Sequence, residues 1–367
     1  MVTLLFAFFL VVTIINIFYY LGYFNFANAL PKPSTKVSLP VSVIICAKNE
    51  AENLQQFLPS IIDQDYPEFE IILINDASTD NTLEIMENFI FQNPQIKLVN
   101  VQNNEAFWGK KKYALTLGIK KAKNPYLLFT DADCAPVSNK WIEKMVAGFD
   151  KEKTIILGYG GYFKQKMSFL NSVIRFETFL TAIQYFSYAK VGVPYMGVGR
   201  NLAYTSTEFF EQNGFATHLH IRSGDDDLFV NQAATSTNTA ITFEKESITR
   251  SIPHKTYKDW FYQKKRHTST ASLYKNQHKL LLGTFYLTQL FFWLTFPVLL
   301  ILQAFWPVVA IIVILRFIIQ FFVFWKSANK LDETDLLWIF PALELFLVCS
   351  QMGIFISNIF SKSSNWK

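Results

Sequence analysis

The chain is short of charge and of cysteine. Only 17% of its 367 residues are charged and three are cysteine, whereas a soluble domain averages about 25% charged residues. The deficit excludes a disordered chain, a collagen and an ordinary wholly soluble enzyme, because part of the chain must avoid water. Three cysteines cannot build a disulfide framework and leave at least one thiol free, which favours a reducing compartment.

Apolar and aromatic residues are abundant instead. They make up 51% and 17% of the chain, and 37 residues are Phe. The net charge of +5 is too small to indicate a nucleic-acid partner, and lysines beside membrane segments would produce it. We therefore expect a lipid bilayer as a partner and no nucleic acid.

The first apolar segment is Met1 to Phe24, which has no charged residue and exceeds the roughly 20 residues that a spanning helix needs. It predicts a transmembrane anchor over residues 1–25. A cleaved signal peptide is the alternative, because Ala27-Asn28-Ala29 resembles a cleavage site. The start lacks a basic region, however, and the run is longer than in a usual signal peptide. Lys32 and Lys36 follow, and the positive-inside rule places the next domain in the cytoplasm.

The second apolar block covers residues 280–360 and predicts three further spans by length. They are Leu280 to Gln303, Ala304 to Trp325, and Leu336 to Phe360. A polar break at Lys326 to Asp335 separates the last two. Three spans would put the C-terminus outside with Lys362 and Lys367, which fits the positive-inside rule poorly.

Two charged residues, Arg316 and Glu344, fall inside this apolar block. Charges in a membrane are costly unless they are paired or hydrated. We predict an ion pair between these two side chains, with a structural role.

Residues 37–279 lie between the apolar blocks and predict an α/β domain. Four short apolar runs are typical of strands: 41–46, 71–75, 96–99 and 126–130. Stretches of helical character follow the first three, at 49–64, 82–91 and 110–123. This alternation predicts a mostly parallel sheet with helices on both faces, and ligands of such sheets bind at the carboxyl ends of the strands.

The fourth run ends in Asp131-Ala132-Asp133. Two carboxylates at alternate positions after a buried strand repel each other unless solvent or a cation intervenes. Oxygen ligands few in number suit Mg²⁺ or Mn²⁺ shared with substrate phosphates. The pattern predicts a metal–diphosphate site, although an Asp-x-Asp alone is common by chance.

Other polar clusters each have two interpretations. Asp76 and Asp80, after the second run, suit a turn and a helix cap. Gly109 precedes Lys110, Lys111 and Lys112 at a helix start, where cations oppose the helix dipole unless an anion such as phosphate lies nearby; a solvated basic face is the alternative.

Two further clusters lie closer to the second apolar block. Asp225, Asp226 and Asp227 precede an apolar run and suit a helix N-terminus or a general base. Gln263 and Arg266, among aromatic residues, suit a basic helix at a membrane surface.

From about Val41 to His267 the chain resembles the family-2 inverting glycosyltransferases with the GT-A fold. The resemblance is strongest to the membrane branch, which includes cellulose, chitin and hyaluronan synthases and ceramide glucosyltransferase. That branch carries the pattern D, D-x-D, acid-acid-D and Q-x-x-R-W. The matching residues are Asp76, Asp131 to Asp133, Asp225-Asp226 after Gly224, and Gln263 to His267. His267 stands where the family usually has Trp, which argues against processive polymer synthesis.

The resemblance implies a role for each matching residue. Nucleotide-sugar binding falls to Lys48, Asn49, Glu50, Asp76, Lys110 and Asp131. The metal falls to Asp133 with Asp131, and the catalytic base is Asp226 with Asp225 as the alternate. Contacts with the diphosphate and the acceptor fall to Gln263, Arg266 and, in a glycine-rich segment, Asn201.

The function implied is a membrane-anchored, metal-dependent inverting glycosyltransferase of the cell envelope. It would move a sugar from a nucleotide-sugar donor, expected to be a UDP-sugar, to a hydroxyl of a membrane lipid or lipid-linked glycan on the cytoplasmic side. A processive polysaccharide synthase is one alternative. The others are a sugar nucleotidyltransferase, which has no need of Gln263 and Arg266, and a noncatalytic membrane scaffold or transporter.

Overall fold

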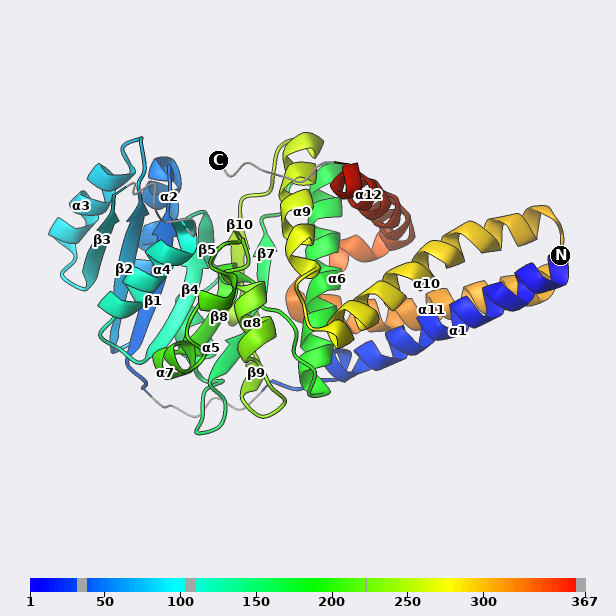
Figure 1. Ribbon diagram of the computed structural model, residues 1–367, viewed down its shortest axis with the longest axis horizontal. Helices are drawn as coiled ribbons and strands as arrows, with labels where there is room; N and C mark the ends of the chain where they lie inside the picture. The colour runs from blue at the N-terminus through cyan, green and yellow to red at the C-terminus, as the bar shows by residue number, and fades with distance from the viewer. Residues whose placement is uncertain (32–37, 103–109, 222, 361–367) are drawn as a thin grey trace. The chain divides into compact units, whose positions relative to one another are not determined.

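The computed structural model describes residues 1–31, 38–102, 110–221 and 223–360 (Figure 1). Lys32, Lys36, Gly109, Lys362 and Lys367 lie outside the described residues. The chain divides into two compact units. The first, the helical unit, contains Met1–Ala29, Met167–Tyr188 and the chain from Thr256 onward. The second, the sheet unit, contains most of the chain from Leu30 to Lys255 apart from Met167–Tyr188.

The sheet unit is built on four parallel strands in the order β3-β2-β1-β4. These are β1 (Val41–Ala47), β2 (Phe69–Asp76), β3 (Ile96–Val101) and β4 (Tyr126–Asp131), so the four predicted strands are confirmed. Six of the seven residues of β1 are buried, and such continuous apolar runs are typical of parallel strands covered on both faces. Their carboxyl ends lie at one edge of the sheet.

Shorter strands complete two sheets. β8 (Leu202–Thr205) pairs antiparallel with β4, and β6 (Ile155–Leu157) and β9 (Thr239–Ile241) extend the sheet to seven strands. A second sheet of three strands has the order β5 (Cys134–Pro136), β10 (Thr249–Ser251) and β7 (Gly160–Tyr162). Asp131 therefore ends a strand of the large sheet, and Asp133 directly precedes a strand of the small one.

Helices cover both faces of the large sheet, as predicted. On one face α2 (Ala51–Ile62), α3 (Thr82–Gln92) and α5 (Trp141–Val146) pack into an apolar core with β1 and β2. On the other face lies α4 (Lys110–Lys121), where a side chain added to Gly118 would meet Ile74 and Ile44. The short α7 (Ser206–Glu211) and α8 (Asp227–Ala233) follow β8 in the chain.

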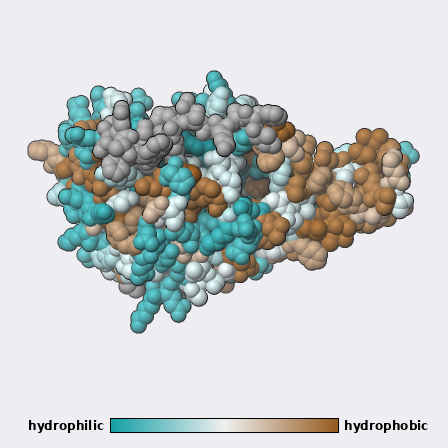
Figure 2. Space-filling model, viewed as in Figure 1, coloured by the Kyte–Doolittle hydropathy of each residue, from teal (hydrophilic) through white to brown (hydrophobic). Residues whose placement is uncertain are grey.

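Among the described residues, four helices are long and apolar enough to span a membrane. They are α1 (Val2–Ala27), α10 (Asn276–Ile301), α11 (Trp306–Leu331) and α12 (Phe340–Phe360). Apolar residues dominate the surface of their long bundle (Figure 2). α6 (Phe169–Lys190) and α9 (Tyr257–Ala271) belong for the most part to the same helical unit, although their residues fall in the range predicted for the soluble domain.

The predicted ion pair between Arg316 and Glu344 is confirmed. Arg316 Nη1 donates to Glu344 Oε2 at 2.9 Å, and both side chains are buried. Arg316 Nε also donates to Asn16 Oδ1 at 3.0 Å, and Gln289 donates to Glu344 Oε1 at 2.7 Å. Because every charge here has polar partners, the pair avoids the cost of an isolated buried ion.

α11 continues into the predicted polar break at Lys326 to Asp335 and ends within it, at Leu331. Lys326 Nζ donates to Asn28 Oδ1 at 2.6 Å, and Lys330 Nζ donates to the Ala29 carbonyl. The C-terminal ends of α1 and α11 therefore lie together. The short helix η4 (Thr334–Trp338) follows, and Arg175 on α6 pairs with Glu333 and with Asp335 at 2.6 Å.

Candidate active site

Asp131 and Asp133 are held at the junction of the two sheets. Asp131 lies beside Cys46 in the register of β4 and β1, and 36% of its side chain stays exposed. Asp133 Oδ2 accepts a hydrogen bond from Ser251 Oγ at 2.7 Å. Burial, with the charge of Asp131, raises the pKa of Asp133. A cation between these carboxylates would relieve that electrostatic cost.

Asp225 and Asp226 approach the same place from the start of α8. Gly224 precedes them with φ of +89°, a conformation that favours glycine. The Asp226 carboxylate accepts N–H bonds from Gly199 at 2.7 Å and from Asp227 at 2.8 Å. Asp226 thus acts as the N-cap of α8. The predicted position at a helix N-terminus is therefore compatible with a position in the candidate site.

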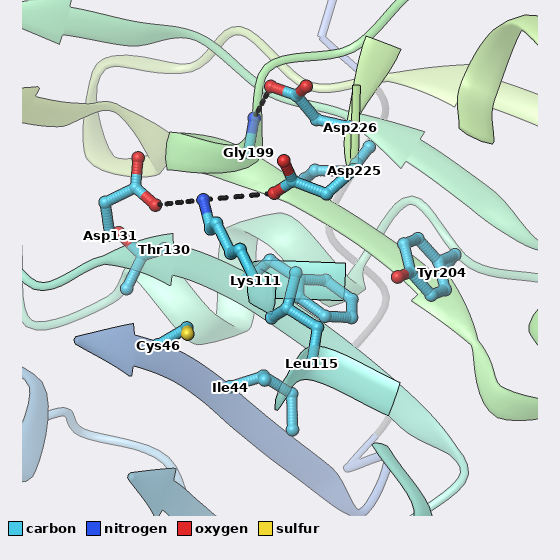
Figure 3. Close-up of a pocket in the computed structure, with 12 residues that line it drawn as sticks. Ile44, Cys46, Lys111, Leu115, Thr130, Asp131, Gly199, Tyr204, Asp225 and Asp226 are labelled. Atoms are coloured by element: carbon cyan, nitrogen blue, oxygen red, sulfur yellow. Dashed lines mark hydrogen bonds and ion pairs between the residues drawn. The ribbon is translucent and has the colours of Figure 1, made fainter. Parts of the chain in front are cut away.

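Lys111 is the cation at the centre of these acids. Its Nζ lies 3.0 Å from Asp225 Oδ2 and 3.3 Å from Asp131 Oδ1 (Figure 3). Burial lowers the pKa of Lys111, but the charges of Asp131 and Asp225 more than offset it, and the net pKa is raised. The lysine therefore stays charged between the two carboxylates.

The two neighbouring acids of α8 acquire opposite properties. Burial raises the pKa of Asp225, but Lys111 overcomes this effect and the net pKa lies below its usual range. Burial and the charges of Asp225 and Asp227 raise the pKa of Asp226 to about 7. One carboxylate is thus fixed as an anion, and its neighbour exchanges a proton near neutral pH.

These groups line one pocket in the sheet unit. Its polar edge is formed by Lys111, Asp131, Gly199, Asp225 and Asp226 (Figure 3). The rest of the lining comes from Ile44, Cys46, Leu115, Phe129, Thr130, Leu202 and Tyr204. Three of the predicted site residues, Asp131, Asp225 and Asp226, therefore converge.

Lys112, next along α4, fixes the loop before the acids. It is almost fully buried, and its Nζ donates to the carbonyl oxygens of His218 at 2.7 Å and Ile221 at 3.1 Å. Burial lowers the pKa of Lys112 to about 8. The two adjacent lysines thus have different partners. Lys111 contacts the carboxylates, and Lys112 contacts the loop that precedes Asp225 and Asp226.

The loops after β1 and β2 are tied to each other and do not line this pocket. The Asn49 N–H donates to Ser78 Oγ at 3.0 Å, and Thr79 donates to Asn49 Oδ1 at 2.8 Å. The Glu50 N–H donates to Thr82 Oγ1 at 2.8 Å. Lys48 precedes this loop, and Asp76 is buried at the end of β2.

The other predicted residues do not line this pocket or are not described in full. Asn201 is fully buried and bonds to protein groups at Trp141, Tyr159 and Ser247, so its amide fixes the segment after Gly199. Gln263 and Arg266 lie on α9 in the helical unit. Lys110 begins α4, and its side chain lies outside the described part of the chain.

Lys111 was missed by the sequence prediction, which chose Lys110. Helix periodicity contains the signal that distinguishes them. Lys111 and Leu115 are four residues apart and therefore share one face of α4, and both line the pocket. Arg200 was also missed: its guanidinium lies 4.2 Å above the Tyr162 ring and donates to the Gly161 carbonyl.

The donor set fits a divalent metal that is shared with a substrate. Among the described residues no group of three or more His, Cys, Asp or Glu side chains could hold a metal alone. Mg²⁺ is commonly held by one or two carboxylates together with substrate phosphates. Asp131, partly exposed, and Asp133, with its raised pKa, provide such a pair.

Comparison with known proteins shows the fold and a similarity to one family. Residues 42–204 match Glycosyl transferase family 2. Over these residues, less than half of the chain, the sequence is similar to that family. The mannosyltransferase PcManGT from Pyrobaculum calidifontis, solved with GDP-Man and Mn²⁺, matches with a TM-score of 0.63 at 18% identity over 99% of each chain. A likeness at that identity shows the fold, and the predicted GT-A fold is confirmed.

Two sequence relatives cover shorter stretches. The poly-beta-1,6-N-acetyl-D-glucosamine synthase of Staphylococcus epidermidis is 41% identical over 93 residues, which is 25% of this chain and 21% of the synthase. A dolichyl-phosphate beta-glucosyltransferase of Trichomonas vaginalis is 28% identical over 148 residues, covering 34% and 43% of the two chains. The matched segments thus span less than half of these relatives.

Replacing Lys112 by Met should destabilise the sheet unit. The change leaves the His218 and Ile221 carbonyl oxygens without their buried donor, and we expect a loss of about 2–3 kcal/mol in the free energy of unfolding. Denaturant titration of the purified protein in detergent measures the loss. The control is Lys120→Met on the exposed face of α4, and equal stability of both variants would contradict the role of Lys112.

Proposed function

We propose that this chain is a membrane-anchored inverting glycosyltransferase that depends on a divalent metal. It moves a sugar from a nucleotide-sugar donor to a hydroxyl of a membrane lipid or a lipid-linked glycan. Residues 37–279 perform the reaction, and residues 1–25 and 280–360 attach it to the membrane. One observation carries the proposal: Asp226, with its raised pKa, lines the same pocket as Asp131 and Lys111.

Asp226 serves as the general base. An acceptor hydroxyl is a weak nucleophile at neutral pH and needs a carboxylate within hydrogen-bond reach to take its proton. The N–H groups of Gly199 and Asp227 orient the two carboxylate oxygens, and a pKa near 7 suits proton transfer at neutral pH. A single displacement by the activated hydroxyl inverts the anomeric centre. Asp225 stays ionised and anchors Lys111.

The opposite side of the reaction is the departing nucleoside diphosphate. Asp131 and Asp133 would hold Mg²⁺ or Mn²⁺, which when bound neutralises charge on the diphosphate. Lys111 supplies a fixed positive charge beside Asp131, and such preorganised charge favours departure of the leaving group. We assign the nucleotide itself to Lys48, Asn49, Glu50, Asp76 and Lys110, following the family pattern.

Two observations support the proposed acceptor: the similarity to one related enzyme and the apolar helices. A related enzyme is named for transfer to dolichyl phosphate, and four helices here are apolar enough for membrane attachment. A lipid or lipid-linked acceptor on the cytoplasmic side follows. Gln263 and Arg266 keep their proposed role near the acceptor and the diphosphate, and Gln263 Oε1 is a buried oxygen without a partner among the described residues.

A processive polysaccharide synthase is the second candidate. The observation that favours it is the 41% identity to a poly-N-acetylglucosamine synthase over 93 residues. Thin-layer chromatography of the product separates the two candidates. A discrete glycolipid supports single transfer, and a polymer of high molecular weight supports the synthase.

Release of nucleoside diphosphate tests the reaction type and the metal together. Purified protein is screened with UDP- and GDP-sugars, with Mg²⁺ or Mn²⁺ present. We expect at least one donor to yield the nucleoside diphosphate, chelation by EDTA to stop its release, and added metal to restore it. Pyrophosphate as the product would indicate a nucleotidyltransferase instead, and full turnover in metal-free buffer would exclude the roles of Asp131 and Asp133.

Asp226→Asn should abolish transfer and preserve donor binding. The amide cannot accept the hydroxyl proton, so we expect kcat to fall by about 100- to 10,000-fold, while the donor Kd measured by calorimetry stays close to that of the wild type. Asp150→Asn is the control, because Asp150 is an exposed acid of the sheet unit that does not line the pocket. Wild-type activity of Asp226→Asn would remove this residue as the base.

The reaction should also depend on pH near neutrality. Asp226, with its pKa raised to about 7, is protonated below that pH and cannot accept a proton. We expect kcat/KM for the acceptor to fall about tenfold per pH unit below 7 and to level off above it. Initial rates from pH 5 to 9 give the profile, and a flat profile between pH 5 and 7 would contradict the assignment.

A further inference from the structure

The far half of the apolar bundle is built from three helices. The near end of the bundle is defined here as the end with Lys326 and Lys330, and the far end as the turn between α10 and α11, residues 302–305. The Phe6 ring on α1 stacks on Phe305 at the far end, 4.5 Å between centroids. A core of buried residues continues from there: Phe9, Val12, Phe292, Leu299 and Val309. Among the described residues, none of this cluster comes from α12.

α12 starts partway along the bundle. Its first residue, Phe340, lies against Phe317 and Phe324 on α11, with ring centroids 6.1 and 5.6 Å apart. Glu344, one turn later, pairs with Arg316. A crossing helix that continued from here would meet the far-end residues next.

The following turns of α12 approach the near end of the bundle instead. Glu344 accepts from Gln289 on α10, but Val348, one turn later, accepts from Tyr286 at 3.4 Å. Tyr19, in the last turns of α1, donates to the carbonyl oxygen of Leu281, in the first turns of α10. α10 therefore begins at the near end, and Tyr286 is closer than Gln289 to that end. The contacts of α12 therefore approach the near end as the helix proceeds.

The last turns of α12 lie on α9. Lys265 Nζ donates to Ser357 Oγ at 2.9 Å, and Asn358 donates to Thr268 Oγ1 at 3.0 Å. α9 ends beside the first turn of α10, where Lys279 donates to the Ser272 carbonyl at 3.4 Å. In Figure 1 the bundle of α1, α10 and α11 extends well beyond α12.

α9 is too polar to accompany a helix across a membrane. It carries Lys258, Lys264, Lys265 and Arg266 within 15 residues, and charged side chains in the hydrocarbon region are costly. Lys264 pairs with Glu177 of α6 at 2.9 Å, and Trp260 donates to the same carboxylate at 3.1 Å. Such a network belongs at a membrane surface, where long basic side chains reach water.

We infer that α12 enters only one leaflet and does not cross the membrane. Its exposed apolar side chains, Leu345, Phe355 and Ile356, bind the acyl chains of the leaflet at the near end, while its other face packs on α9. The described part of the chain then crosses the membrane three times, by α1, α10 and α11. α12 ends on the same side as Lys326.

This topology removes the conflict noted in the sequence. With four crossings, Lys362 and Lys367 were on the side opposite to Lys326 and Lys330. With three crossings all four lysines, together with Lys32 and Lys36, lie on one side. That distribution agrees with the positive-inside rule.

Cysteine labelling of the full chain tests the number of crossings. Lys367→Cys is compared with Asn329→Cys at the near end and Leu302→Cys at the far end, and the wild type gives the background from the native cysteines. Cells are treated with a membrane-impermeant maleimide before and after permeabilisation. We expect Lys367→Cys to behave as Asn329→Cys does, and labelling together with Leu302→Cys would overturn the inference. The result does not depend on glycosyltransferase activity.

A second measurement tests the contact with lipid. Nitroxide labels are attached at Phe355→Cys on α12 and at Ser269→Cys on the exposed face of α9, and the proteins are placed in phospholipid bilayers. We expect oxygen to relax the α12 label more strongly than a water-soluble nickel complex does, with the reverse order at Ser269. Equal nickel access at both positions would show that α12 lies in water and would overturn the lipid-binding role.

Discussion

Lys111 holds together carboxylates that would otherwise repel one another. Strands that end at the same edge of a sheet bring their following residues together, and here those residues are acids. The ammonium group lies within 3.3 Å of Asp131 and Asp225 and keeps both close to the pocket. It also decides which acid of the pair before α8 is an anion, because no cation in the described part of the chain lies as close to Asp226, whose pKa is raised. The difference in pKa between Asp225 and Asp226 thus follows from the position of Lys111.

The helical unit stabilises its own charged pair through polar side chains of the protein. Arg316 and Glu344 are fully buried, and neutral polar groups of Asn16, Tyr20 and Gln289 surround them. In the sheet unit, open space remains beside Asp131 for a substrate. In the helical unit the charged groups of Arg316 and Glu344 are buried and contact each other directly. The first arrangement suits binding, and the second suits a fixed position of α12 against α11.

Much of the fold could be predicted because it depends on composition over several residues. The strands 41–47, 69–76, 96–101 and 126–131 each contain a run of apolar residues, because helices cover both faces of the sheet. The three-residue strands 134–136, 160–162 and 249–251 contain too few residues for any periodicity. α6 was missed because Asn171, Arg175 and Glu177 interrupt its apolar pattern, and their partners come from distant parts of the chain.

The candidate site could be predicted in type and less well in detail. The acids were recognised from their order along the chain, whereas the choice between Lys110 and Lys111 depends on which face of α4 meets the sheet. For Asn201, the glycine-rich segment predicts a contact with the ligand, whereas the sequence does not indicate the three protein groups to which its amide is hydrogen-bonded. Hydropathy likewise measures the length of α12 and contains no information on where its two ends lie.

The contacts of α1 have a consequence for biosynthesis. The hydrogen bond between Asn16 of α1 and Arg316 joins residues that are 300 positions apart in the chain. The ion pair of Arg316 then requires Glu344, which is synthesised a further 28 residues later. The ribosome therefore delivers the first apolar helix long before its polar side chain can be satisfied, and completes the whole sheet unit in between. The polar network of the bundle is therefore complete only after almost the entire chain is made, and a product truncated before Arg316 would keep only the bond of Asn16 to Thr288.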